Sequence, residues 1–271
     1  MTEPTRHPVR LAVHGACGRM GIEILRATRN RTDCQLTAAL VRAASTWIDE
    51  PLSRVLGSSA PDLDFTAHLD PQVAVDVMVD FSTSDALETA LAIAELRKIA
   101  FVCGTTGLSD AQLARLKRAC EHIPILWSSN FSLGVALLKR MVAMAAAQLG
   151  PEFEAEILEI HHRAKKDAPS GTALALGRAI AQARQQTFED VYRYARQGTA
   201  DGRGPDEIGF AVLRAADVIG EHTVMFASEG ERIEITHRAN SRAIFANGAL
   251  RSAIWLARQP PGWYDVSDVL G

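Results

Sequence analysis

The first half of the chain alternates short apolar runs with segments of helical spacing. Apolar, β-branched runs predict strands at residues 10–14, 34–41, 73–81, 99–103 and 125–128. Apolar positions at helical spacing predict helices at residues 22–27, 86–97, 110–120 and 133–149, and Ser82 to Ser84 can cap the second of them. Such alternation favours right-handed crossovers and a parallel sheet covered on both faces. Residues 43–71 show little periodicity, so we expect loops with short elements there.

The pattern changes after Gly150 and Pro151, which suit the end of a helix. Polar and apolar residues alternate over 153–160, and helical spacing follows from Ala173 to Ile180. Further strands are predicted at residues 207–213, 217–227 and 231–236. These elements indicate a smaller α+β domain with an open sheet connected mainly by hairpins. Helical spacing returns from Gly248 to Trp255, and we expect this helix to rejoin the first domain.

Length and composition narrow the class of protein. The chain has 271 residues, 47% of them hydrophobic, which is enough for one large or two ordinary packed domains. A net charge of -3 disfavours a nucleic-acid or anionic-membrane partner. No apolar run reaches the roughly 18 to 20 residues that span a bilayer. The start is polar and the four cysteines are widely separated, so we expect a cytoplasmic protein with reduced thiols.

A glycine turn follows the first predicted strand and precedes the first helix. It runs from Gly15 through Ala16, Cys17, Gly18, Arg19 and Met20 to Gly21. Strand, glycine turn and helix form a dinucleotide-binding unit, in which backbone amides approach a pyrophosphate. The spacing G-x-x-G-x-x-G differs from the usual one, so the turn alone is a weak signal. The second strand ends in Val41 and Arg42, and an arginine there makes NADPH at least as favoured as NADH.

Two more loops follow strands of the predicted parallel sheet. They contain Gly104, Thr105, Thr106 and Gly107 in one case and Ser128, Ser129, Asn130 and Phe131 in the other. Ligands of parallel sheets bind beyond the carboxyl ends of the strands, where all three loops fall. The sequence therefore predicts one nucleotide site at this edge.

The segment from His161 to Thr172 contains several residues suited to catalysis or anion binding. It holds two adjacent histidines and three cations, Arg163, Lys165 and Lys166, between a predicted strand and a predicted helix. After Pro169, residues Ser170, Gly171 and Thr172 are expected to point free backbone amides outward at the helix start. Such a start attracts a carboxylate or phosphate, so we predict a small, multiply anionic ligand. A zinc site is less favoured because no cysteine or further histidine follows at ligand spacing. His222 and His237, isolated on strand patterns, are interpreted as structural.

Seven segments, in order along nearly the whole chain, resemble the 4-hydroxy-tetrahydrodipicolinate reductases, also called dihydrodipicolinate reductases. They are Gly15–Gly21, Gly104–Gly107, Ser128–Phe131, His161–Lys165, Asp167–Thr172, Gly220–Thr223 and Phe245–Gly248. The resemblance implies an enzyme of lysine and diaminopimelate synthesis that reduces a cyclic dicarboxylate imine with NADH or NADPH. It also implies a homotetramer assembled mainly through the sheets of the second domain.

The resemblance also implies roles for single residues. Residues Gly15 to Met20 would cradle the pyrophosphate, Arg42 would lie by the adenosine ribose, and residues 104–106 and 128–131 would border the nicotinamide. His161 matches a proton donor or acceptor and Lys165 a proton donor. The substrate contacts would come from His162, Ser170, Gly171 and Thr172. Val41 departs from the pattern, because many relatives have an acid there, and this weakens the case for an NADH preference.

We expect a Rossmann-like parallel sheet domain of residues 1–131 and 241–271, and a substrate-binding and tetramerisation domain of residues 132–240. Because the cofactor loops and the substrate loop lie on different domains, closure must bring them together, with hinges near 131–133 and 240–242. Two alternatives remain open on the sequence. An NADPH-binding regulator has no need of Lys165 beside His161, and a dehydrogenase of an amino-acid semialdehyde does not require the 161–172 loop.

Overall fold

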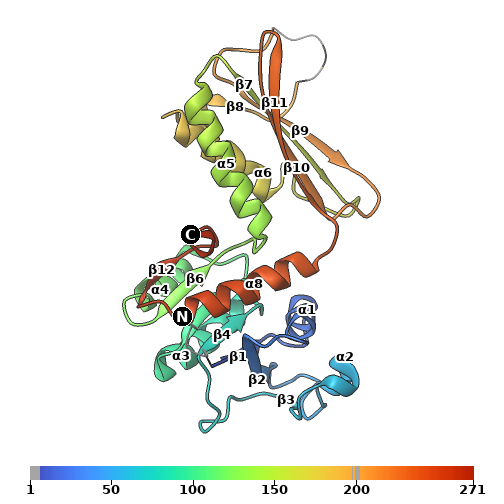
Figure 1. The fold of residues 1–271 in the computed structure, drawn as a ribbon, viewed down its shortest axis with the longest axis vertical. Helices are drawn as coiled ribbons and strands as arrows, with labels where there is room; N and C mark the ends of the chain where they lie inside the picture. The colour runs from blue at the N-terminus through green and yellow to red at the C-terminus, as the bar shows by residue number, and fades with distance from the viewer. Residues whose placement is uncertain (1–6, 197, 199–201) are drawn as a thin grey trace, which may run out of the picture. The chain divides into compact units, whose positions relative to one another are not determined.

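A computed structural model describes residues 7–196, 198 and 202–271 (Figure 1). The chain divides into two compact units. Unit 1 contains the residues up to Ser132 together with Ala243–Gly271, and unit 2 is Leu133–Arg242. The chain therefore crosses between the units at 132–133 and again at 242–243.

The described residues of unit 1 form a seven-stranded sheet in the order β12-β6-β5-β4-β1-β2-β3, and every pairing is parallel. This is the strand order of dinucleotide-binding sheets, with the order reversing between β1 and β4. The strands are β1 Val9–His14, β2 Cys34–Leu40, β3 Phe65–Thr66, β4 Val77–Asp80, β5 Ala100–Cys103, β6 Pro124–Trp127 and β12 Gly262–Tyr264.

Helices of unit 1 cover this sheet. Apolar residues of α3 and α4 pack with Met78, Phe101 and Ile125 in one buried core. Helix α8 contacts α1, β4, β5 and β6, so a helix near the end of the chain packs on strands from the first half of the sequence. The helices are α1 Arg19–Ala27, α2 Ser53–Leu56, α3 Leu87–Arg97, α4 Asp110–Ala119 and α8 Ala243–Leu256, with short 3-10 turns at Gly57–Ser59, Ser84–Ala86 and Asp268–Leu270.

The described residues of unit 2 form a mixed five-stranded sheet in the order β11-β10-β7-β9-β8. β10 pairs antiparallel with β11 and with β7, whereas β7 and β8 run parallel to β9. The strands are β7 Glu154–His161, β8 Tyr192–Arg193, β9 Ile208–Arg214, β10 Gly220–Ser228 and β11 Glu231–Ala239. The helices are α5 Leu133–Leu149, α6 Gly171–Ala183 and α7 Phe188–Val191.

One face of this second sheet is packed and the other is partly open. Burial alternates along β7 and β10, as a one-sided sheet requires. The packed face contributes Ile157, Phe210, Val224 and Phe226 to a core shared with α5 and α6. Glu159 and His161 lie on this packed face because they follow Ile157 at intervals of two residues.

The predicted fold class is confirmed, since a parallel Rossmann-like sheet is followed by a smaller mixed sheet. Several details were wrong. The third strand begins at Val77 rather than residue 73, and no side chain of residues 82–84 caps the following helix. Of the strands that the structure describes in this sheet, only β10 and β11 form a hairpin between neighbours in sequence, because β7 is inserted between β9 and β10.

Within the described ranges, we find no helix whose length and apolar character would suit it to cross a membrane.

Candidate functional site

The carboxyl ends of β1 and β4 are joined by buried polar contacts at the point where the strand order reverses. His14 Nδ1 lies 2.6 Å from Asp80 Oδ1, and Thr105 Oγ1 donates to Asp80 Oδ2 over 2.7 Å. Asp80 is completely buried. The N–H of Gly104 also donates to the Asp80 carbonyl over 2.8 Å. Asp80 therefore fixes the ends of three neighbouring strands at the edge where such sheets bind nucleotides.

The glycine turn follows β1 at this edge. Gly15 has a φ of 75°, and a Cβ there would lie 2.7 Å from the Phe81 carbonyl oxygen. Ala16 is buried and donates its N–H to Leu40. Gly18 is the N-cap of α1 without a side-chain cap, and the first turn of the helix has no acidic residue. An uncapped helix start preceded by glycines fits a pyrophosphate, so the observed turn suits a dinucleotide.

The remaining predicted cofactor residues of this turn differ in exposure. Arg19 is exposed, Met20 is partly buried, and the Cys17 Sγ lies 3.8 Å from Ser45 Oγ. Arg42 is exposed, two residues after the end of β2 at Leu40. Its guanidinium is thus accessible at the strand end where a ribose phosphate would be recognised.

The loops after β5 and β6 lie at the same carboxyl edge of the sheet. Thr105 is buried and Thr106 is exposed. Ser128 accepts the Asn130 N–H at 3.1 Å and donates to the Asn130 carbonyl at 2.8 Å, while Ser129 is exposed. The Phe131 ring is buried against Phe81, with 5.2 Å between the ring centroids. The Phe131 ring therefore packs in the interior beside this edge of the sheet, while the Thr106 and Ser129 side chains are accessible to solvent.

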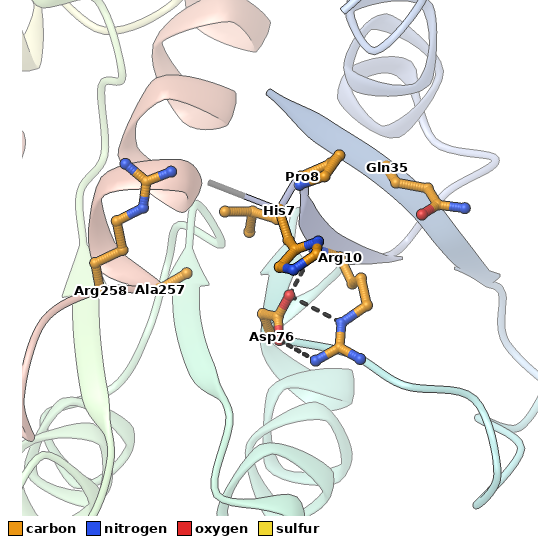
Figure 2. Close-up of a pocket in the computed structure, with 8 residues that line it drawn as sticks. His7, Pro8, Arg10, Gln35, Asp76, Ala257 and Arg258 are labelled. Atoms are coloured by element: carbon orange, nitrogen blue, oxygen red, sulfur yellow. Dashed lines mark hydrogen bonds and ion pairs between the residues drawn. The ribbon is translucent and has the colours of Figure 1, made fainter. Parts of the chain in front are cut away.

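A cavity of about 570 Å³ lies at the other end of these strands. Figure 2 shows Arg10 and Asp76 hydrogen bonded to one another in its lining, with Arg258 apart from them on the left of the view. Arg10 Nε and its own N–H both donate to Asp76 Oδ2, at 3.0 Å and 2.8 Å, and hydrogen bonding to Arg10 lowers the pKa of Asp76. This cavity is at the amino ends of β1 and β4, so it is separate from the nucleotide edge.

The site in unit 2 is built on a completely buried carboxylate, Glu159. Its Oε2 is hydrogen bonded to His161 Nδ1 and accepts Arg214 Nη1 at 2.9 Å. Its Oε1 accepts Arg214 Nη2 and the Ser170 N–H, both at 3.0 Å. Burial alone raises the pKa of Glu159, but the hydrogen bonds from Arg214 and His161 outweigh it and hold the pKa below its usual value. Burial lowers the pKa of His161, against the opposing effect of Glu159.

Ser170 joins this carboxylate to the start of α6. Its Oγ accepts the Ala173 N–H at 3.1 Å as the N-cap and lies 3.1 Å from His222 Nε2. The expectation of an outward-pointing Ser170 amide was wrong, because this N–H donates to buried Glu159. Gly171 is exposed and Thr172 partly buried in the first turn of α6, so the helix start itself reaches the surface.

Lys165 and His162 lie on the loop between β7 and α6. Lys165 Nζ forms an ion pair with Asp167 at 2.9 Å, and Arg214 Nη2 donates to the Asp167 carbonyl at 2.6 Å. His162 is partly buried, and its carbonyl accepts the Lys165 N–H. The structure thus brings His161, Lys165 and the α6 start together around Glu159 and Arg214. Among the described residues, no group of three or more His, Cys, Asp or Glu side chains is arranged to hold a metal ion.

Sequence reasoning missed three residues of this cluster. Glu159 was interpreted as one more polar position of an alternating strand, and Arg214 received no role. His222 was interpreted as an isolated structural histidine, yet its ring packs edge-on against His161 with 5.1 Å between centroids. The available signal was periodicity, because Glu159 and His161 occupy the same face as buried Ile157.

The chain matches two family models that together span most of it. Residues 9–131 match the model of the dihydrodipicolinate reductase N-terminus, and residues 134–270 match that of its C-terminus. A 4-hydroxy-tetrahydrodipicolinate reductase of Pseudomonas fluorescens is 46% identical, with 96% of this chain and 98% of the relative covered. That of Pseudoalteromonas atlantica is 43% identical over 97% and 98%.

A solved structure shares the fold. The dipicolinate-bound dihydrodipicolinate reductase from Paenisporosarcina sp. TG-14 gives a TM-score of 0.73 at 23% identity, over 95% of this chain and 97% of that one. With both family models matched in order and relatives above 40% identity over nearly the whole length, the chain belongs to the dihydrodipicolinate reductase family.

Proposed function

We propose that the protein is an NAD(P)H-dependent 4-hydroxy-tetrahydrodipicolinate reductase of lysine and diaminopimelate biosynthesis. The reaction forms tetrahydrodipicolinate from the hydroxylated substrate or from the dihydrodipicolinate that its dehydration gives. The observation that carries the proposal is the loop of unit 2, where His161, Lys165 and the exposed start of α6 are held around one buried carboxylate.

NADPH or NADH would supply the hydride. The uncapped start of α1 and the turn from Gly15 to Met20 would hold the pyrophosphate, since backbone amides and the helix dipole favour an anion there. Arg42 would contact the adenosine ribose, and its positive charge suits a 2′-phosphate. Residues 104–106 and 128–131 would border the nicotinamide end.

The two carboxylates of the substrate need fixed hydrogen-bond donors. The first turn of α6 offers the backbone amides of Gly171 and Thr172 together with the positive end of a 13-residue helix. The Thr172 hydroxyl and the His162 ring would add side-chain donors, while Ser170 holds the helix start in place through its cap. This arrangement favours a small dicarboxylate over a neutral ligand.

Hydride addition to a conjugated imine leaves electron density that a proton must take up. Lys165, a cation on the loop, would donate this proton, and His161 would donate or accept a proton at the Nε2 atom that Glu159 does not contact. We assign to the connections at 131–133 and 240–242 the closure that brings cofactor and substrate together.

The open face of the second sheet is our candidate for the contact of a cytoplasmic homotetramer. Leu213 on β9, the register partner of Ile160 on β7, is 51% exposed on this face, and partly exposed positions alternate along β7 and β10. Exposed apolar side chains on one sheet face are typical of protein interfaces. Sedimentation of the purified protein would measure the assembly directly.

The test of the function is the oxidation of NADPH and of NADH by purified protein, with the condensation product of pyruvate and aspartate semialdehyde formed freshly in the cuvette. Rapid oxidation that depends on this product is the expected result. Oxidation with free aspartate semialdehyde alone would indicate a dehydrogenase that reduces the aldehyde of the semialdehyde to an alcohol. Tight NADPH binding without any turnover would favour a regulator.

A further inference from the structure

Arg214 and Glu159 form an ion pair that contacts His161, the Ser170 N–H and the loop that carries Lys165. The guanidinium binds both carboxylate oxygens of Glu159, and Arg214 is the register partner of His161 in the parallel pairing of β7 and β9. Arg214 Nη2 also donates to the Asp167 carbonyl, and the Asp167 side chain pairs with Lys165. The pair therefore touches both the histidine and the loop that carries the lysine.

Each oxygen of Glu159 accepts two hydrogen bonds, so the carboxylate is fully occupied. An ionised carboxylate accepts hydrogen bonds but cannot donate them. His161 must then carry a hydrogen on Nδ1, because Nδ1 faces Glu159. In the neutral ring, this leaves the lone pair on Nε2.

The surroundings of His161 Nε2 differ from those of Nδ1. A Cβ built at Gly220 would lie 3.0 Å from Nε2, so the absence of a side chain at this residue leaves room beside the atom. The groups that face the ring are Glu159 on its own strand, Arg214 on β9, His222 on β10 and Lys165 on the loop. Nε2 is therefore the ring nitrogen that can exchange a proton with a ligand.

We propose that Glu159 and Arg214 are positioning residues that fix His161 in its Nδ1–H tautomer and couple it to the Lys165 loop and the α6 start. The inference rests on the proposed function, which gives His161 its role in proton transfer. The coupling to α6 runs through the Ser170 N–H, which binds the same carboxylate. Neither residue contacts substrate in this assignment, and each acts through another side chain.

The decisive variant is Glu159→Gln, which keeps the shape of the side chain but removes its charge and lets it donate. We expect kcat to fall by about 100-fold, the scale of general acid–base catalysis, with KM changed little. The matched control is Glu156→Gln, on the same strand and also paired with arginines, Arg196 and Arg203. Its kcat should equal that of the unmodified protein.

The second readout is the tautomer itself, measured without substrate by ¹⁵N NMR of histidine-labelled protein, with the His161 signal assigned by its loss in His161→Asn. The unmodified protein and Glu156→Gln should show a protonated Nδ1 and a bare Nε2, whereas Glu159→Gln should show a mixture. A structural role alone would leave these ring signals unmoved. This NMR measurement tests whether Glu159 positions His161 even if no reductase activity is found.

If Glu159→Gln does not fold, Arg214→Lys is the alternative variant. Lysine keeps the positive charge but cannot form the bidentate contact with the Glu159 carboxylate. We expect kcat to fall by about 10-fold, with the His161 signals broadened between two forms. The proposal is overturned if the folded variants keep kcat within about twofold of the unmodified protein. It is equally overturned if His161 carries its hydrogen on Nε2 before any substitution.

Discussion

The hydroxyl oxygen of Ser170 lies 3.1 Å from Nε2 of His222, and this contact ties the N-cap of α6 to β10. His222 is 3% exposed, and its burial lowers its pKa to about 4. The charges of His161, His237 and Lys165 act in the same direction as burial, and that of Glu159 opposes them. His222 therefore stays neutral in the folded protein at pH values where a histidine in an unfolded chain is charged.

This difference predicts a loss of stability in mild acid. As the pH falls below the ordinary value of 6.5, the unfolded chain binds a proton at His222 and the folded protein does not until about pH 4. The free energy of unfolding should then fall by about 2 kcal/mol between pH 7.5 and pH 5 through this group. Urea unfolding of the protein and of His222→Asn at pH 7.5 and at pH 5 measures this change. Equal losses of unfolding free energy in the two proteins would contradict the assignment to His222.

Lys165→Ala and Thr172→Val should separate proton transfer from substrate binding. Loss of the proton donor should lower kcat by about 100-fold. Loss of the Thr172 hydroxyl should raise KM by about tenfold, the scale of one hydrogen bond to a charged group. Steady-state kinetics with Lys166→Ala as the control, an exposed neighbour on the same loop, test both. Similar kcat losses in the two variants with KM unchanged would contradict these separate roles.

Arg42→Ala should weaken the use of NADPH more than that of NADH. The exposed guanidinium after β2 would bind the 2′-phosphate, which only NADPH carries. We expect the NADPH to NADH ratio of kcat/KM to fall by about tenfold, the worth of one charge-assisted hydrogen bond. Arg54→Ala, which removes another exposed arginine of unit 1, should leave the ratio unchanged. An unaltered ratio in Arg42→Ala would remove Arg42 from the cofactor site.

Gly248→Ala should destabilise the protein although it lies within helix α8. Alanine in a helix interior is favoured over glycine by about 1 kcal/mol. Here the new Cβ would lie 1.8 Å from the Phe131 carbonyl oxygen, so packing outweighs propensity and unfolding should become easier by about 1 to 3 kcal/mol. Arg251→Ala, at an exposed position of the same helix, is the control. A rise in melting temperature for Gly248→Ala would refute this packing.

The sequence predicted those elements that are set by residues close together in the chain. Helix α5 has the predicted ends, Leu133 and Leu149, because its apolar spacing is unbroken. The start of α4, predicted at residue 110, is fixed by a capping box of Ser109 and Gln112, whose hydrogen bonds join residues only three apart. Strands β3 and β12 escaped prediction because two or three residues carry no period, and only pairing with β2 and β6 orders them.

The site could be predicted only as far as it lies in one segment. His161, Lys165 and the α6 start are close in sequence, so the loop was visible as a candidate. Glu159, Arg214 and His222 come from three strands, and their meeting depends on register. Arg214 is the partner of His161 across β9, and His222 is the partner of Glu159 across β10. A one-residue slip in either pairing would reverse these side chains, and nothing in the local pattern sets that register.

The return of the chain from unit 2 to unit 1 sets an order for assembly during synthesis. All residues of unit 2, Leu133–Arg242, are contiguous, so its core can form as soon as that segment leaves the ribosome. Strands β1 to β6 of unit 1 are translated first, yet their packing against α8 and the pairing of β6 with β12 must wait for Ala243–Leu256 and Gly262–Tyr264. In a nascent chain stalled before residue 243, unit 2 would therefore be folded while unit 1 is incomplete. The strands of unit 1 that α8 does not yet cover would be a target for chaperones.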